Sequence, residues 1–447
     1  MKKHALISLF SAAALVAMST TVMYGQYIKT IAGTGVSGYS GDGGLAIGTQ
    51  LSYPSGVSVD ALGNVYIADK NNYRVRKIAA GTGIISTFAG TGSFGGPLTY
   101  GIAPTSCAFE YPIGVFSSPT GDLLVTDNYR DMTFYIDHVT GEIFSRLGCG
   151  TQGTSGDGGP ANMAMMELPL SACEDGAGNT YIADGWLGIR KVTAATGLAS
   201  LVTATAAQGV FFDLSTTTDL YFSTNNTIKK LNVVTGAMTT VAGTGVAGYS
   251  GNAGPAVSAQ LSNPGNMFID AHRILYVCDR GNNAIREINL NTGNIMTIAG
   301  NGTMGFSGDG GFAPFSRLND PEGVWVDMSG YIYIADAGNQ RVRMIIPKGA
   351  PGGGGTSSPK ALNGMDNAVN EDINVYPNPS NGMFTLQVGS AQVGASVNVY
   401  SILGQLVYQG IVADVKNTLD LSKLPSGIYT LMMRSDSGTY TQKLTKQ

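Results

Sequence analysis

Short apolar runs alternate with polar turns along most of the chain, and the pattern recurs at a nearly fixed interval. The run VYIAD at residues 65–69 returns as LLVTD, TYIAD, LYVCD and IYIAD, which end at Asp127, Asp184, Asp279 and Asp336. A less regular copy, LYFST, ends at Thr224. The spacing is about 57 residues, apart from one interval of about 40 before Thr224. Repetition at this period predicts a fold built from similar units.

Each unit has the same internal order of runs and turns. In the first, GVSVD at residues 56–60 is followed by a Gly-Asn turn, by VYIAD, by RVRKI at residues 74–78 and by IISTFAG. Runs rich in Val, Ile and Tyr between Gly, Asn and Thr turns are typical of antiparallel strands. Four strands in each repeating unit predict the blades of a β-propeller.

The two ends of the repeat region complement each other. It begins with IKTIAG at residues 28–33, a fourth strand without the preceding three, and ends with RVRMI at residues 341–345, a third strand without a fourth. A ring in which the first strand completes the last sheet leaves no open edge. The sequence therefore predicts an all-β fold with a six-bladed β-propeller over residues 27–346, closed by its N-terminal strand.

The chain continues beyond the repeats with a change of composition. Residues 347–371 are rich in Gly, Pro and Ser and predict a flexible linker. Residues 372–447 alternate again, as in FTLQV, VNVYS and GIYTLMMR. Short strands at this spacing predict a small Ig-like β-sandwich.

The N-terminus has the pattern of a targeting segment. Lys2 and Lys3 precede an apolar run over residues 5–18, and small residues follow. This pattern predicts a signal peptide over residues 1–25, with cleavage after Ser19 or after Gly25. Because no later segment reaches about 20 apolar residues, we expect no membrane span in the mature chain.

Charge and cysteine content limit the function classes. The net charge of −4 provides no basic surface, so nucleic acid is not an expected partner. Four cysteines in 447 residues do not make a disulfide framework, although Cys107 and Cys149 fall in adjacent loops and could pair. Three histidines, without a Cys/His cluster, exclude a zinc site built from several histidines.

The repeat region resembles bacterial NHL-repeat β-propellers. The segments IKTIAGTGVSGYSGDGG and QLSYPSGVSVDALGNVYIADKNNYRVRKI carry the resemblance, which extends over roughly residues 27–346. Units two and four depart from it, at LTYGIAPTSCAFEYPIGVFSSP and TATAAQGVFFDL. The resemblance implies a binding platform, although some related propellers are lyases or lactonases.

The C-terminal segment closely resembles the type A sorting domain of the type IX secretion system. The matching segments are VYPNPSNGMFTLQV, VNVYSILGQLVYQG and LPSGIYTLMM. The resemblance implies passage through the periplasm, recognition by the type IX machinery, and release or attachment at the outer cell surface.

Glycine-rich loops between the units invite a chemical interpretation. GYSGDGG at residues 38–44 recurs from Gly153, Gly248 and Gly305, but no Gly-Lys-Ser/Thr follows it and no Asp-x-Asp spacing is present. We expect a turn between blades, with the Asp or Asn side chain bonded to its own backbone. A cation such as calcium at the loops remains an alternative, with Asp42, Asp157 and Asp309 as its candidate ligands.

Two sets of strand residues have both a chemical and an architectural interpretation. The aspartate that ends five of the six VYIAD-like strands is expected to bond the turn or the third-strand arginine. Glu174 is the only charged residue at its position in the first strands of the six units. It is either a channel ligand and acid/base group or a solvated residue at the end of a strand, and we favour the second interpretation. The adjacent position in the first strands is mainly aromatic and includes Phe116, Phe211, Phe268 and Trp325. We expect these side chains to pack between blades.

The second unit holds the candidate contact surface, namely Tyr100, Phe109, Tyr111 and Tyr129, because aromatic side chains are favoured in recognition. The sequence thus predicts a non-catalytic, secreted or surface-attached protein that binds a protein or glycan through one propeller face. The alternative is a secreted hydrolase or lyase with a metal in a deep polar channel that contains Glu174.

Overall fold

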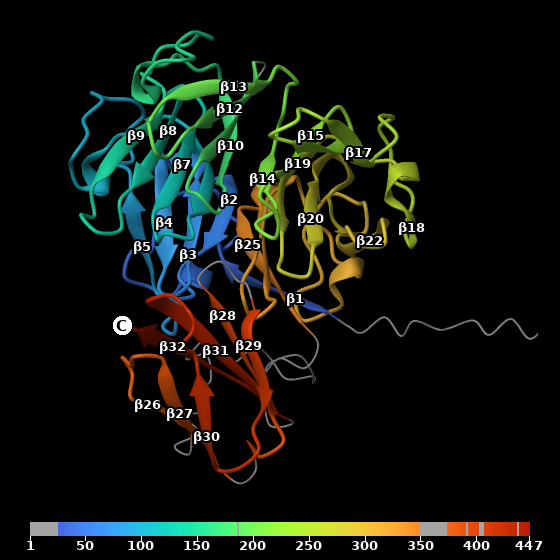
Figure 1. Ribbon diagram of the computed structural model, residues 1–447. Coiled ribbons are helices and arrows are strands. Elements are labelled where there is room, and N and C mark those ends of the chain that lie inside the picture. The colour runs from blue at the N-terminus through green and yellow to red at the C-terminus, as the bar shows by residue number, and fades with distance from the viewer. Residues whose placement is uncertain (1–25, 186, 348–372, 390–391, 402–405, 436–437) are drawn as a thin grey trace, which may run out of the picture.

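A computed structural model describes residues 26–185, 187–347, 373–389, 392–401, 406–435 and 438–447. The expected signal peptide and nearly all of the expected linker lie outside these residues. The described part is built from short strands, and its helices are single 3₁₀ turns (Figure 1). These turns are η1 (Ala46–Gly48), η2 (Lys70–Asn72), η3 (Pro104–Ser106), η4 (Ala161–Met163), η5 (Ala256–Ser258), η6 (Arg280–Asn282), η7 (Ala313–Phe315) and η8 (Ala337–Asn339).

The repeats form six antiparallel sheets in the described residues. The first strands are β2 (Pro54–Val59), β6 (Pro112–Ser117), β10 (Pro169–Glu174), β14 (Val210–Phe212), β19 (Pro264–Ile269) and β23 (Pro321–Val326). They contact one another in this order, and β23 contacts β2 again. The sheets therefore stand as blades around one axis, with the first strands innermost.

The remaining strands follow outward in chain order. The second strands are β3 (Val65–Asp69), β7 (Leu123–Asp127), β11 (Thr180–Asp184), β15 (Asp219–Thr224), β20 (Ile274–Asp279) and β24 (Ile332–Asp336). The third strands are β4 (Arg74–Ile78), β8 (Met132–Ile136), β12 (Gly188–Val192), β16 (Thr227–Asn232), β21 (Ala284–Asn289) and β25 (Arg341–Ile346). The fourth strands are β5 (Ile85–Ala89), β9 (Ile143–Leu147), β13 (Ala199–Thr203), β17 (Met238–Ala242), β22 (Asn294–Ala299) and, for the last blade, β1 (Tyr27–Ala32). A short strand, β18 (Gly254–Pro255), pairs with β22.

The N-terminal strand closes the ring as the sequence predicts. β1 pairs antiparallel with β25, with Ile28 opposite Ile345. Ile28 is fully buried against apolar side chains of the last two blades. The edge of the last sheet is therefore covered by a strand from the other end of the repeat region.

The burial of the second strands explains their continuous apolar sequences. All five residues of β3, β7, β11 and β24 are buried. A strand in the middle of a blade is covered on both faces by the neighbouring blades, so both alternating sets of side chains lie in the core.

Aromatic side chains from separated blades meet on the axis. The Phe116 ring lies 5.6 Å from Trp325 and 6.0 Å from Phe211, although these residues belong to the second, sixth and fourth blades. Phe268 lies 4.7 Å from Trp325 and 4.9 Å from Phe211. The expected packing between neighbouring blades is thus extended across the channel. We call Phe116, Phe211, Phe268 and Trp325 the axial plug.

The C-terminal segment forms two further sheets, with strand orders β26-β27-β30 and β29-β28-β31-β32. Phe384, Leu386, Val397 and Leu431 are buried in a core shared by the two sheets. The strands are β26 (Asn374–Tyr376), β27 (Met383–Gln387), β28 (Ser396–Ser401), β29 (Leu406–Ile411), β30 (Lys416–Asp420), β31 (Gly427–Ser435) and β32 (Gly438–Lys446). Two sheets around one core agree with the predicted β-sandwich.

Candidate functional site

Strained backbone is concentrated at one end of the channel, where the first strands begin. We call this end the mouth. The residues before the first-strand prolines include Tyr53, Leu168, Asn263 and Asp320, with φ between 47° and 54°. Residues before proline normally adopt extended conformations, so this positive φ costs energy of about 1–3 kcal/mol at each position. Such strain persists only where the surrounding structure enforces it.

A clasp between adjacent blades enforces the strain. In four junctions, the backbone N–H of the residue before proline donates to a side-chain oxygen in the turn between the second and third strands of the preceding blade. The donor–acceptor pairs are Tyr53 and Gln340 at 2.5 Å, Leu168 and Asp131 at 2.9 Å, Asn263 and Asn226 at 2.8 Å, and Asp320 and Asn283 at 3.0 Å. Because it recurs around the ring, the clasp is part of the architecture.

The junction of the first and second blades departs from this rule. Tyr73 occupies the position of Gln340 and Asn283, and its ring packs on Tyr111 with centroids 5.8 Å apart. Phe94 lies 5.5 Å from Tyr73, and Tyr129 lies 4.7 Å from Tyr111. Phe94 and Tyr129 are 53% and 57% exposed. We call Tyr73, Phe94, Tyr111 and Tyr129 the surface aromatic cluster.

Asp127 holds Tyr111 in this arrangement. Its carboxylate accepts hydrogen bonds from the backbone N–H groups of Glu110 at 2.7 Å and Tyr111 at 2.8 Å. Phe134 replaces the arginine found at this position of the third strand in four other blades. Burial raises the pKa of the Asp127 carboxyl to about 6, against the lowering effect of these N–H donors. The bond to Glu110 recurs in other blades, as between Ser52 and Asp69, so the second unit departs from the repeat in the bond to Tyr111 and in Phe134.

A charged group borders the cluster at the mouth. The Lys70 ammonium lies 4.9 Å from the Tyr53 ring centroid and 5.7 Å from that of Tyr111. The Tyr53 hydroxyl donates to Asp320 and to Glu322. Arg280 forms ion pairs with both of these carboxylates. The mouth thus combines aromatic faces, two cations and two carboxylates from four blades.

The structure separates the predicted contact residues. Tyr111 and Tyr129 lie together in the surface aromatic cluster. Phe109 is fully buried and packs edge-to-face on Phe134, so its assignment to a contact surface is wrong. Phe109 occupies the position at which the other crossover loops have an apolar core residue, which explains its burial. Tyr100 is 40% exposed, and its hydroxyl points to the Met132 sulfur at 3.8 Å.

The predicted disulfide is not formed. All four cysteines are free thiols in the structure. Cys107 is buried in the apolar core of the second blade, where burial raises the pKa of its thiol to about 11. A thiol in such surroundings stays protonated and behaves as a small apolar side chain.

Glu174 is neither a channel ligand nor a solvated residue. Its side chain is buried between the second and third blades, at the opposite end of the first strand from the mouth. It accepts hydrogen bonds from Ser118, from Thr180 at 3.2 Å and from Arg146 at 3.3 Å. Burial raises the pKa of this carboxyl, whereas Ser118 and Arg146 lower it. These hydrogen bonds indicate that Glu174 has a structural role.

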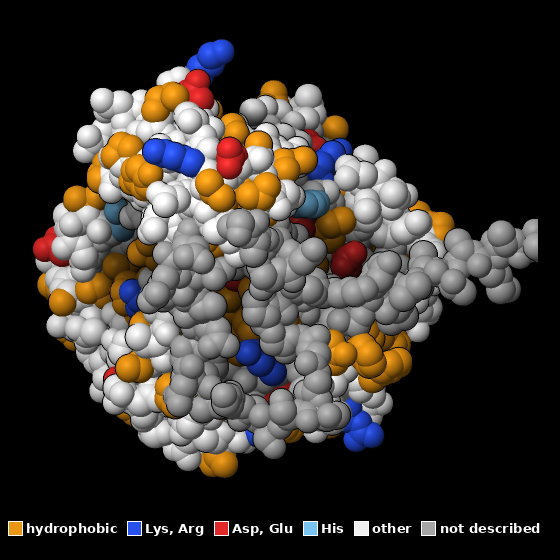
Figure 2. Space-filling view, turned by 90° about the horizontal axis from the view of Figure 1, so that it is seen from below, with side chains coloured by type: hydrophobic (Ala, Val, Ile, Leu, Met, Phe, Trp, Pro, Cys, Tyr) orange, Lys and Arg blue, Asp and Glu red, His pale blue; other side chains and the backbone are white. Residues whose placement is uncertain are grey.

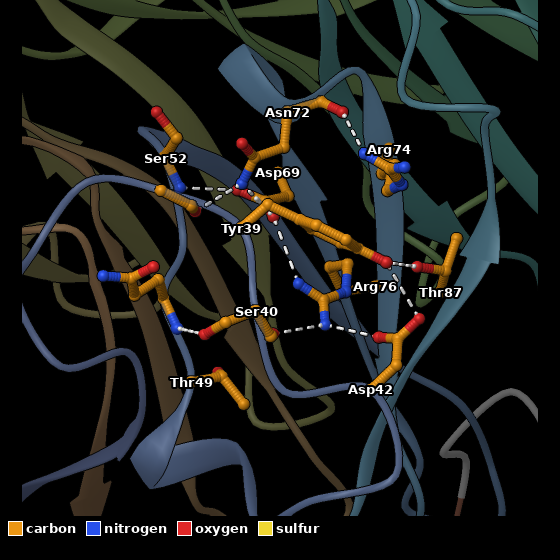
Figure 3. Close-up of polar contacts among 12 residues, drawn as sticks. Tyr39, Ser40, Asp42, Thr49, Ser52, Asp69, Asn72, Arg74, Arg76 and Thr87 are labelled. Atoms are coloured by element: carbon orange, nitrogen blue, oxygen red, sulfur yellow. Dashed lines mark hydrogen bonds and ion pairs between the residues drawn. The ribbon is translucent and has the colours of Figure 1, made fainter.

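The glycine loops are turns between blades, as expected, and their aspartates also pair with buried arginines. In Figure 3, the buried Arg76 guanidinium reaches Asp42 at 2.6 Å and the Ser40 carbonyl oxygen at 3.2 Å. It also contacts the strand-end carboxylate of Asp69 at 3.5 Å, as the repeat pattern predicted. Arg190 and Arg343 bind Asp157 and Asp309 in the same way, at 2.9 and 2.7 Å.

The loop aspartates are therefore ion-pair partners of buried arginines, and the expected bonding to their own backbone is wrong. A guanidinium at this distance repels a cation and occupies the carboxylate oxygen that would bind it. This geometry favours the architectural role of Asp42, Asp157 and Asp309 over the calcium alternative.

The fifth blade allows this role to be tested, because Asn252 replaces the loop aspartate. Its oxygen lies 3.4 Å from Arg286. We expect Asn252→Asp to raise the free energy of unfolding by up to about 1 kcal/mol, because the new ion pair is partly exposed. Thermal unfolding at low and high salt measures the effect, which salt should reduce. Asp309→Asn is the matched reverse change, and stabilisation by it would contradict the assignment.

Neither the channel nor a metal-ligand cluster supports the alternative enzyme hypothesis. A cavity of about 30 Å³ is lined by Phe116, Phe211 and Trp325 of the axial plug and by Gly56 and Gly114, among others. Within the described residues, one group of potential metal ligands is present, formed by Asp122, Asp137 and His138 away from the channel. His138 Nδ1 lies 2.7 Å from Asp122 there. Glu174 instead borders a cavity of about 490 Å³ between the propeller and the C-terminal domain, which Asp175, Leu424 and Tyr429 also line. Among the described residues, this cavity brings no histidine or potential metal-ligand cluster to Glu174.

The surface seen from below carries few charged side chains, and these are scattered among uncharged ones (Figure 2). No extended basic area is visible among the described residues of this face. In the described part of the chain, no helix combines the length and the hydropathy needed to span a membrane.

Comparison with known protein families identifies two segments. Residues 374–447 match the model of the secretion system C-terminal sorting domain, and residues 51–78 match the NHL repeat. The chain carries an NHL repeat and a type IX sorting domain. The sorting domain indicates export by the type IX system to the cell surface or beyond, and interaction with its machinery. Both resemblances drawn from the sequence are confirmed.

Solved structures show the same propeller fold. A structural genomics protein of unknown function from Bacteroides thetaiotaomicron has a TM-score of 0.56 at 16% identity, over 72% of this chain and 75% of that one. An auxiliary nutrient binding protein from Bacteroides ovatus has a TM-score of 0.54 at 16% identity, over 72% of this chain and 77% of that one. Identities this low establish the fold alone.

One curated relative matches part of this chain and is a much longer protein. The protein SUPPRESSOR OF QUENCHING 1 of Arabidopsis thaliana is 29% identical over 272 residues, which are 60% of this chain. This chain spans 22% of the length of that relative.

Sequence reasoning missed Lys70, Tyr73 and Phe94. Tyr73 carries a signal that an alignment of the repeats reveals, since an aromatic residue replaces the amides Asn283 and Gln340. Lys70 aligns with Arg280 and so resembles a repeated feature. Phe94 lies in a loop without a counterpart of the same length, and only the tertiary structure brings it to Tyr73.

Proposed function

We propose that this exported protein is a non-catalytic binding protein that captures an extracellular protein or glycan at the mouth of its propeller. The observation that carries the proposal is the junction of the first and second blades. There an exposed aromatic cluster replaces the clasp that holds four other junctions together. Aromatic rings that leave water on binding are the side chains that most often dominate recognition energy.

The wider context supports a binding role. Export to the cell surface or beyond exposes the propeller to extracellular ligands. The auxiliary nutrient binding proteins among the structural neighbours have the same fold. In the described part of the chain, the aromatic rings of the axial plug meet at the centre of the ring, which favours a surface site over the metal-dependent alternative.

Alanine substitutions in the surface aromatic cluster test this site. The full secreted chain is screened on arrays of glycans and of extracellular proteins, and its strongest partner is then titrated. We expect Phe94→Ala and Tyr129→Ala each to weaken binding by at least about tenfold, since each removes an exposed ring.

Phe315→Ala is the matched control, because Phe315 is 71% exposed on another part of the propeller. We expect it to leave binding unchanged, and all three variants to keep the melting temperature of the parent chain. Equal loss in the control, or full binding by both cluster variants, would place the site elsewhere.

A further inference from the structure

The charge beside the surface aromatic cluster indicates what kind of ligand it accepts. Lys70 and Arg280 occupy equivalent positions in the first and fifth blades. Arg280 is neutralised by Asp320 at 3.0 Å and by Glu322. In contrast, Lys70 forms no ion pair among the described residues, and its ammonium contacts aromatic faces. Its charge favours the ionised forms of Asp320 and Glu322, but these carboxylates are bound directly by Arg280. Lys70 therefore remains able to bind a further negatively charged group directly.

A second cation, Arg74, follows Tyr73 in the chain, and its guanidinium lies 3.9 Å from the Tyr39 ring centroid. The Arg74 guanidinium donates to the carbonyl oxygens of Asn72 at 3.1 Å and Thr91 at 3.0 Å, next to Tyr73 and the Phe94 loop. Carbonyl oxygens satisfy its hydrogen bonds without cancelling its charge. Within the described residues, Arg74 has no carboxylate partner at ion-pair distance. Two cations thus lie near the cluster in a chain whose net charge is −4.

The aromatic part favours a sugar ring over a peptide. The cluster consists of turn and loop residues and offers no free strand edge to which a peptide backbone could add. Three of its four rings are tyrosines, which present an apolar face together with a hydroxyl. A pyranose ring has the complementary surface, because C–H groups line its faces and hydroxyls line its rim.

We propose that the surface aromatic cluster, with Lys70 and Arg74, binds an anionic polysaccharide whose sugar rings carry carboxylate or sulfate groups. The sugar faces stack on Phe94 and Tyr129, and the acidic groups bind the two cations. This inference rests on the proposed function, since it names the ligand class of the same site.

The test uses polysaccharides that differ in charge but share a backbone. The full secreted chain is titrated with polygalacturonate and with its highly methyl-esterified form, and with dextran sulfate and neutral dextran. We expect the charged member of at least one pair to bind at least about tenfold more tightly, and added salt to weaken that binding.

Substitutions of Lys70 connect the charge preference to the site. Lys70→Gln should weaken binding of the preferred anionic polymer by about tenfold, and Lys70→Arg should largely retain it. Lys77→Gln is the matched control, because Lys77 also lies over two rings, 5.5 Å from Tyr66 and 5.7 Å from Phe88, but away from the mouth. It should leave binding unchanged.

Other outcomes overturn the inference in distinguishable ways. Equal binding of charged and neutral polymers that depends on Phe94 and Tyr129 would reject the anionic ligand but retain the proposed site. Binding of poly-L-glutamate as tight as that of the anionic polysaccharides would indicate an acidic protein partner and reject the sugar. Full binding by Lys70→Gln would remove Lys70 from recognition. If no array partner depends on the cluster, the proposed function itself fails.

Discussion

Replacement of Arg286 by methionine is expected to lower the free energy of unfolding by about 3–5 kcal/mol. Arg286 is fully buried, and its guanidinium lies 3.1 Å from the fully buried carboxylate of Asp279. It also donates to the Ser250 carbonyl oxygen at 2.9 Å. The substitution leaves the carboxylate without its cation in a region that excludes water. Denaturant unfolding followed by tryptophan fluorescence measures the change.

The double substitution Arg286→Met with Asp279→Asn separates the buried charge from lost packing. We expect it to recover part of the stability, because the remaining side chain is neutral and keeps hydrogen-bonding capacity. A double variant no more stable than Arg286→Met would show that the isolated charge is not the cause. Stability equal to that of the parent chain in Arg286→Met would contradict the structural role of the repeated pair.

Substitution of Ile28 by aspartate is expected to open the ring. Ile28 is fully buried in β1, and loss of such a side chain alone costs about 2–5 kcal/mol. An unpaired carboxylate at the same place adds a desolvation cost. β1 should then detach from β25 and expose an unpaired edge, which favours aggregation. Thermal unfolding and light scattering together detect the two effects.

Lys29→Gln changes the charge of the neighbouring residue in the same strand and is the control. Lys29 is only partly buried, so we expect a much smaller shift in melting temperature. A stable, monomeric Ile28→Asp variant would show that the propeller does not depend on closure by its N-terminal strand.

The sequence predicted those features that depend on neighbours within one repeat. The order of four strands, the completion of the last sheet by β1 and the pairing of Asp69 with Arg76 all follow from spacings that recur. The sorting domain could also be predicted from the sequence, because its motifs occupy one continuous segment. Local periodicity suffices in these cases, since it determines which face of a strand is buried and which turn follows it.

Contacts between units could not be predicted from spacings within one repeat. Glu174 is the only charged residue at its first-strand position, yet Ser118 and Arg146 of the neighbouring blade surround it. Phe109 looked like a recognition residue because its unit is irregular, although it fills a core position. The loop aspartates looked like possible cation ligands until the structure placed a guanidinium beside each of them.

The amino-acid sequence by itself determined the repeating blade, the closure of the ring and the route of export, because each is encoded in short spacings or continuous motifs. Only the tertiary structure decided that aromatic side chains meet on the axis and that the surface aromatic cluster, our proposed binding site, lies between the first two blades. Trp325 meets Phe116, and Lys70 meets Tyr111, only after the ring has closed. Such contacts depend on the relative position of whole blades, which no periodicity within a blade specifies.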